Sequence, residues 1–156
     1  MKDIFHYNSI ESYFNAISKE LHKKEKRKKV VLTREWAKQF DKLRGVYFIF
    51  EKEKLKYVGE TGSLNGRMAD LLNTKNHTLR RSIGERMFSM EKGYRKASST
   101  QSYIPSIEEK LNDYIKANLS VSCLPLEIGR KEFEEWVIES NPDLLFYNKR
   151  KKRSTK

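Results

Sequence analysis

The sequence has few of the residues that support disulfides, cysteine-built metal sites or membrane spans. It contains 156 residues but a single cysteine, Cys123, which excludes an intramolecular disulfide and a zinc site made of several cysteines. The longest apolar run, at 45–50, is about six residues, whereas a membrane span needs roughly 20. The first ten residues lack the apolar centre of a secretory signal. We therefore expect one soluble domain in a reducing compartment, the cytoplasm, without a membrane partner.

The charge is strongly one-sided. Lys and Arg number 33 against 21 Asp and Glu, so the formal net charge is +12 at pH 7. Such an excess favours a polyanionic partner, and nucleic acid is the first candidate. Basic residues gather in 19–29, which is either a solvated linker or a phosphate-contacting arm. They also gather in the tail, 149–156, which we expect to be mobile and to add nonspecific affinity.

The spacing of apolar residues predicts several amphipathic helices. Ser9, Thr33 and Ser63 each precede such a segment and have side chains suited to an N-cap. The predicted helices cover residues 9–21, 34–43, 63–72, 77–88, 106–117 and 131–139.

Three segments are typical of strands. Residues 45–50 form a buried apolar strand, 55–59 its return strand, and 119–128 a third strand. The pattern predicts an α+β fold, with a small three-stranded antiparallel sheet flanked by helices. We expect this domain to cover 45–148, after an N-terminal helical and basic extension, 1–44.

Two short motifs lie on the first two predicted strands. Residues 45–47 are Gly-Val-Tyr and residues 57–59 are Tyr-Val-Gly, which places Tyr47 and Tyr57 ten residues apart. On neighbouring antiparallel strands the two phenols could share one face of the sheet. A lone tyrosine in a strand is usually a core residue, but a pair followed ten residues later by Arg67 is a more specific signal.

These motifs, followed in order by Arg67, Glu134 and Asn148, resemble the GIY-YIG nuclease superfamily. The sequence around them is most similar to the bacterial and phage branch that includes small restriction-type enzymes. The resemblance covers about residues 44–148. It implies hydrolysis of phosphodiester bonds in double-stranded DNA with Mg²⁺ or Mn²⁺. It also allows a homodimer, because two single active centres are needed to cut both strands.

The position of Arg67 on its predicted helix is informative. With about 100° of rotation per residue, Arg67 falls beside Leu64, at the margin of the apolar stripe. From there its guanidinium could extend into solvent or point into a cleft, where its planar fork suits phosphate oxygens. The spacing from Tyr57 favours the cleft. The resemblance implies that Arg67 stabilises the charge that develops on the phosphate.

The last predicted helix contains one glutamate that differs from the others. By the same rotation, Glu134 falls between Val137 and Ile138 on the apolar side, whereas the other glutamates lie opposite. A carboxylate among core residues is costly unless it is paired or bound to a metal. The resemblance makes Glu134 the metal ligand. One carboxylate with water and phosphate oxygens suits Mg²⁺.

The resemblance implies further roles at this site. Tyr47, with Tyr57, would position or deprotonate the attacking water, although a phenol needs a metal or Arg67 to lower its pKa for that purpose. Family members commonly place a Tyr or His one turn after the arginine, where this chain has Leu71. His77 is either its substitute or a surface residue that caps a helix. Asn148 would orient the tyrosine or the backbone.

Three basic residues surround His77 and are candidates for DNA contact, namely Lys75, Arg80 and Arg81. We expect them to bind phosphates rather than bases. The function predicted overall is a Mg²⁺-dependent, restriction-type DNA endonuclease. Two alternatives remain: a nucleic-acid-binding protein that kept the fold and lost its chemistry, favoured by Leu71, and a structure-specific or mobile-element nicking nuclease.

Overall fold

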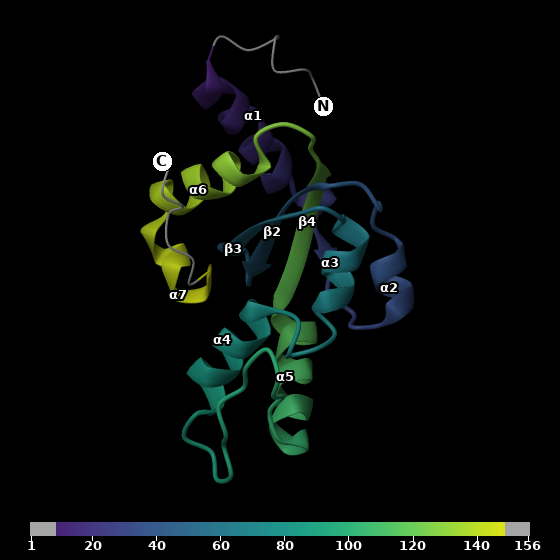
Figure 1. Cartoon of the computed structure of the whole chain (residues 1–156), viewed down its shortest axis with the longest axis vertical. Coiled ribbons are helices and arrows are strands. Elements are labelled where there is room, and N and C mark those ends of the chain that lie inside the picture. The colour runs from purple at the N-terminus through teal and green to yellow at the C-terminus, as the bar shows by residue number, and fades with distance from the viewer. Residues whose placement is uncertain (1–8, 149–156) are drawn as a thin grey trace.

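A computed structural model describes residues 9–148, which contain an antiparallel sheet with helices on both faces (Figure 1). Its strands are β1 (Lys28–Lys29), β2 (Gly45–Glu51), β3 (Lys54–Thr61) and β4 (Leu119–Pro125), in the order β1-β4-β2-β3. The α+β class and the β2–β3 hairpin agree with the prediction. The number of strands does not, because the sheet has four strands rather than three.

The strand missed by the sequence analysis is β1, which pairs with β4 through Lys28 and Lys29. Both side chains are exposed, and both belong to the basic run at 19–29, whose composition predicts a linker or an arm rather than a strand. A strand of two charged residues has no alternation of apolar and polar positions to detect. Short, lysine-rich strands are typical of a protected sheet edge.

The helices begin close to where the sequence predicted them. Ser9, Thr33 and Ser63 each accept a hydrogen bond from a backbone N–H in the first turn, so the three predicted N-caps are confirmed. After the last long helix, a 3₁₀ turn (Pro142–Leu144) and a short helix follow that the sequence analysis did not predict. The helices are α1 (Ile10–His22), α2 (Arg34–Lys38), α3 (Leu64–Asp70), α4 (Thr78–Phe88), α5 (Pro105–Asn118), α6 (Arg130–Ser140) and α7 (Leu145–Asn148); another 3₁₀ turn covers Lys24–Lys26.

The sheet separates two hydrophobic cores. Side chains alternate along β2, so Val46 and Phe48 join α1 and α6 on one face, while Tyr47 and Ile49 join α3, α4 and α5 on the other. All of β2 is buried because helices cover both of its faces. Residues from α1 and α2 contribute to these cores. None of the helices described is both long and apolar enough to cross a membrane.

The short C-terminal elements complete one edge of the sheet. The edge strand β3 is contacted by α6 and α7, and α7 also packs on α4 (Figure 1). The face of the sheet that carries Tyr47 and Tyr57 is therefore bordered by α3, α4 and α7.

Candidate active site

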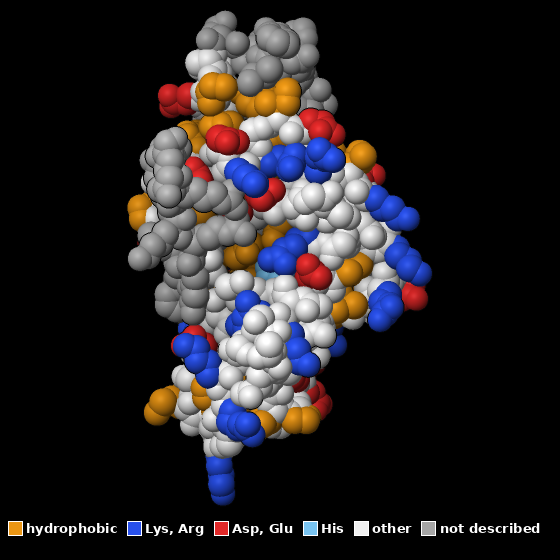
Figure 2. Space-filling view, viewed as in Figure 1, with side chains coloured by type: hydrophobic (Ala, Val, Ile, Leu, Met, Phe, Trp, Pro, Cys, Tyr) orange, Lys and Arg blue, Asp and Glu red, His pale blue; other side chains and the backbone are white. Residues whose placement is uncertain are grey.

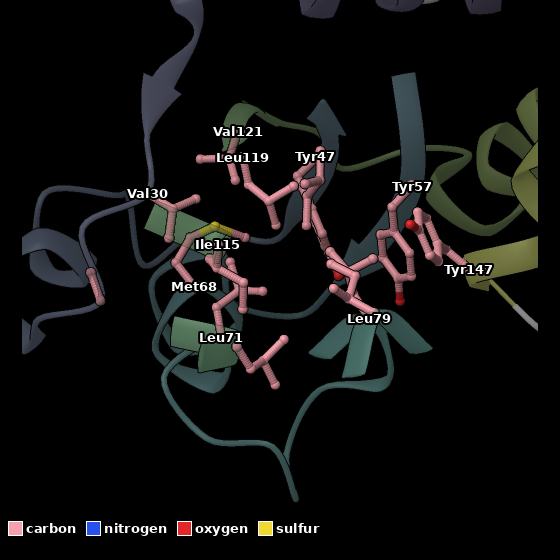
Figure 3. Packing of buried hydrophobic residues seen from close by; sticks show 14 of the residues in the cluster. Val30, Tyr47, Tyr57, Met68, Leu71, Leu79, Ile115, Leu119, Val121 and Tyr147 are labelled. Carbon is pink, nitrogen blue, oxygen red and sulfur yellow. The ribbon is translucent and has the colours of Figure 1, made fainter. Parts of the chain in front are cut away.

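The two motif tyrosines lie next to each other on one face of the β2–β3 hairpin. Tyr47 is paired with Gly59 and Tyr57 with Ile49, so the two tyrosines are diagonal neighbours. Their rings are stacked, with centroids 6.0 Å apart and an interplanar angle of 27°. Both side chains are buried, and Figure 3 shows Tyr57 between Tyr47 and Tyr147 of α7.

The glycines of the two motifs make room for this arrangement. A Cβ atom at Gly59 would lie 2.3 Å from Cζ of Tyr47, so only glycine allows the ring to lie across β3. A Cβ atom at Gly45 would lie 2.4 Å from the carbonyl oxygen of Leu124 on β4. The requirement at both positions is space for close approach, which an unsubstituted Cα provides.

Arg67 projects from α3 toward the hydroxyl of Tyr47. Its Nε donates to that oxygen at 3.1 Å, while Nη1 donates to Asp70 at 3.1 Å and to the carbonyl oxygen of Asn76 at 3.0 Å. Among the described residues, Nη2 has no hydrogen-bond acceptor, and the side chain is 23% exposed. The guanidinium is thus fixed on one side and open on the other.

His77 reaches the same hydroxyl from the start of α4. The side chain is fully buried, its Nε2 lies 3.3 Å from the Tyr47 oxygen, and its Nδ1 accepts the backbone N–H of Leu79 at 3.2 Å. His77 is therefore both the N-cap of α4 and a neighbour of the tyrosine pair. Leu71 is instead a core residue, and Figure 3 shows it among Met68 and Ile115, away from the paired rings.

The charges at this site follow from its burial. Desolvation raises the pKa of Tyr47 well above 10, with a further contribution from Tyr57, and Arg67 opposes that rise. Desolvation also lowers the pKa of His77, and Arg67, Arg81 and Arg80 add to that effect. Burial disfavours the charge of Arg67, but its interactions with Tyr47, Tyr57 and Asp70 prevail and raise its pKa. At neutral pH the site holds a neutral phenol, a neutral imidazole and a guanidinium cation.

Asn148 contacts the backbone of β3 rather than another side chain of the site. Its Oδ1 accepts the N–H of Val58 at 3.2 Å, and its Nδ2 donates to the Val58 carbonyl oxygen at 2.6 Å. Since β3 is an edge strand, these two groups have no neighbouring strand on that side. The side chain of Asn148 satisfies both groups and holds the strand segment that carries Tyr57 and Gly59.

Glu134 lies where the helical rotation predicted. It is 3% exposed on α6, between the buried residues Phe133 and Val137, and α6 packs on β3. Within residues 9–148, no three His, Cys, Asp or Glu side chains form a cluster able to hold a metal ion. A single buried carboxylate fits a cation such as Mg²⁺, which retains most of its waters and takes one or two protein carboxylates.

The three predicted DNA-contacting residues differ in their exposure. Lys75 is exposed, and Arg81 is half-buried, with Nη1 donating to the carbonyl oxygens of Thr74 and Lys75. Arg80, in contrast, is buried, and all three of its nitrogens donate hydrogen bonds within the protein. They donate to Thr74, to the Leu71 carbonyl oxygen, and to Glu108 and Asn112 of α5.

The residues that hold Arg80 were not found by the sequence analysis. Glu108 forms an ion pair with Arg80 at 2.8 Å and accepts the hydroxyl of Thr74 at 2.7 Å. These contacts fix the segment between α3 and α4, which carries His77. No local pattern could have indicated them, because Glu108 and Asn112 follow Arg80 by 28 and 32 residues.

The described residues thus combine a tyrosine pair on a hairpin, an arginine on the following helix that contacts it, and a buried carboxylate on a later helix, all on an α+β scaffold. A family model described as the GIY-YIG catalytic domain matches residues 29–156, and the chain belongs to this family. No curated protein and no solved structure matches the chain. The family match supports an endonuclease activity.

Proposed function

We propose that this protein is a Mg²⁺-dependent DNA endonuclease of the restriction type. The observation that carries the proposal is the convergence of Arg67 and His77 on the hydroxyl of Tyr47, at 3.1 and 3.3 Å. Two polar side chains, from α3 and from the start of α4, thus meet at the hydroxyl oxygen of Tyr47, which belongs to an otherwise apolar core. Buried polar groups arranged in this way are costly for stability alone and are typical of catalytic sites.

Each side chain has a role suited to its geometry. The open Nη2 of Arg67 binds an oxygen of the scissile phosphate and stabilises the negative charge that develops there. Tyr47, supported by Tyr57, orients the attacking water or, as a phenolate, accepts its proton. Glu134 would hold the divalent ion, which supplies Lewis-acid stabilisation of the phosphate when bound. Asn148 keeps β3, and with it Tyr57, in place.

The basic surface suits a DNA substrate. Lys and Arg side chains are distributed along the length of the face viewed in Figure 2, including the surroundings of a central hollow. With a net charge of +12, binding to phosphates should weaken steeply as salt increases. A homodimer would bring two centres to the two strands, and we place the protein in the cytoplasm.

Plasmid cleavage tests the proposal. Supercoiled DNA with Mg²⁺ should be cut by the wild type, and Arg67→Ala and Glu134→Gln should each be slower by about 100-fold or more. The matched controls are Arg34→Ala and Glu132→Gln, which change exposed residues of α2 and α6 and should leave cleavage unchanged.

The outcomes separate the candidate functions. Discrete fragments indicate sequence-specific cutting, whereas accumulation of nicked circles indicates a nicking enzyme. If the wild type and all variants bind DNA but none cleaves it, the non-catalytic reading favoured by Leu71 is correct. The contact between His77 and Tyr47 argues against this alternative. Leu71 lies in the core and cannot supply the missing Tyr or His, but His77 places a histidine at the tyrosine pair.

A further inference from the structure

His77 has a defined tautomer. The backbone N–H of Leu79 is a donor only, and it points to Nδ1 of His77 at 3.2 Å. Nδ1 must therefore be the unprotonated nitrogen that accepts this bond, and in a neutral imidazole the proton then resides on Nε2. This assignment follows from the N-cap geometry of α4 and does not depend on the chemistry of the site.

The protonated nitrogen is the one that faces Tyr47. Nε2 lies 3.3 Å from the phenolic oxygen, so it donates a hydrogen bond to that oxygen. Arg67, which has only donors, also donates to it from Nε at 3.1 Å. A neutral phenol has two lone pairs, and both are occupied by these donors. His77 thus presents no free lone pair to Tyr47.

From this geometry we infer that His77 is a positioning residue that donates from Nε2 to Tyr47 and, with Arg67, stabilises its phenolate. When Tyr47 ionises, its O–H bond breaks and the proton leaves to solvent, while His77 retains its own proton on Nε2. The role in cleavage rests on the proposed function, whereas the tautomer and the hydrogen bond do not.

The surroundings of His77 keep it neutral. The groups that face it are Tyr47 of β2, Tyr57 of β3, Arg67 of α3, and Arg80 and Arg81 of α4. None of these is a carboxylate, and three are cations. Protonation of Nδ1 would add a further buried positive charge and remove the acceptor that caps α4. Burial and the three arginines accordingly lower the pKa of His77.

The tautomer can be observed directly in the wild-type full chain. Long-range ¹H–¹⁵N NMR of the imidazole nitrogens distinguishes the two neutral tautomers from the imidazolium, and the His77 signals are assigned by their loss in His77→Gln. We expect protonated Nε2 and unprotonated Nδ1 at every pH between about 5.5 and 8. A proton on Nδ1, or an imidazolium within this range, would overturn the inference.

Two variants separate donation from proton acceptance. In His77→Gln the side-chain amide can still donate to Tyr47 but cannot act as a base, whereas in His77→Asn the shorter amide can cap α4 but cannot reach Tyr47. We expect Gln to keep cleavage within about 10-fold of the wild type and Asn to lose about 100-fold, the effect of losing a donor to a charged oxygen.

The two variants also distinguish a loss of activity from a loss of folding. Thermal unfolding of both should show a folded protein, with α4 better capped in the Asn variant. Equal and large losses of cleavage in Gln and Asn would mean that His77 accepts the proton, which contradicts the inference. If the wild type has the expected tautomer but does not cleave DNA, the proposed function fails and the positioning role of His77 at Tyr47 stands.

Discussion

Substitution of Gly59 by alanine tests the geometry of the site most directly. The added Cβ would lie 2.3 Å from Cζ and 2.4 Å from the hydroxyl oxygen of Tyr47. Ordinary contacts between heavy atoms are about 3.5 Å or longer, so the ring must move by about 1 Å. The oxygen of Tyr47 would then leave the positions in which Arg67 and His77 donate to it.

The expected size of the effect differs between activity and stability. A misplacement of about 1 Å at a reacting group costs about 100-fold in rate, so cleavage should fall by at least that factor. Overpacking of a core costs about 1–3 kcal/mol, which for a chain of this size lowers the Tm by about 2–12 °C. The protein should therefore stay folded at 25 °C while losing most of its activity.

Gly62 provides a matched control three residues further along. A Cβ atom at Gly62 would meet no atom within 4 Å, so Gly62→Ala should leave both cleavage and Tm close to those of the wild type. The assay is Mg²⁺-dependent plasmid cleavage by both variants, together with thermal unfolding. Wild-type cleavage by Gly59→Ala, or an equal loss in both variants, would refute the argument that Gly59 makes room for Tyr47.

Three further predictions concern other buried groups. Because folding lowers the pKa of His77, the unfolded chain binds more protons than the folded protein below about pH 6.5. The free energy of unfolding should therefore fall by about 1.4 kcal/mol for each pH unit that the pH is lowered below about 6.5. Urea unfolding at pH 7 and 5.5 should show this loss in the wild type and not in His77→Gln. Arg80→Met should lower the free energy of unfolding by about 3 kcal/mol, because it leaves Glu108 without its cation. The control is Arg95→Met, which changes an exposed arginine; an equally small loss in both variants would contradict this prediction. Burial raises the pKa of Cys123 to about 12, so iodoacetamide should modify it only after denaturation, and rapid modification of the folded protein would show this thiol to be accessible.

Much of this architecture was predictable because its signals are local. The apolar run of β2 and the short turn after it identify the hairpin, and the hydroxyls of Ser9 and Ser63 identify two helix starts. The burial of Glu134 was predictable in the same way, since rotation along a helix fixes which side chains face the core. Each of these inferences uses residues only a few positions apart.

The parts that escaped prediction depend on partners distant in sequence. Strand β1 forms because Lys28 and Lys29 pair with β4, more than 90 residues later. Neither side chain has the apolar or β-branched character that would predict a strand. Arg80 and Arg81 are adjacent and chemically identical, yet only Arg80 meets Glu108 and Asn112 of α5. Which of two neighbouring arginines points inward is decided by the packing of α4 on α5.

The segment between α3 and α4 explains how His77 is held in place, although it follows a loop. Its carbonyl oxygens are bound by three arginines: Arg80 at Leu71, Arg81 at Thr74 and Lys75, and Arg67 at Asn76. Backbone carbonyls are present whatever the side chain, so the side chains at 75 and 76 are free to vary without loss of these contacts.

Arg67 closes this arrangement, because it binds Tyr47 through Nε and, through Nη1, the carbonyl oxygen of the residue before His77. The two donors to Tyr47 are thus connected to each other as well as to the phenol. A displacement of His77 must disturb Arg67, and a displacement of Arg67 must disturb both donors at once. Water and phosphate would meet between the phenolic oxygen of Tyr47 and the open Nη2 of Arg67. The distance between these two atoms is therefore set by one connected group of side chains rather than by independent ones.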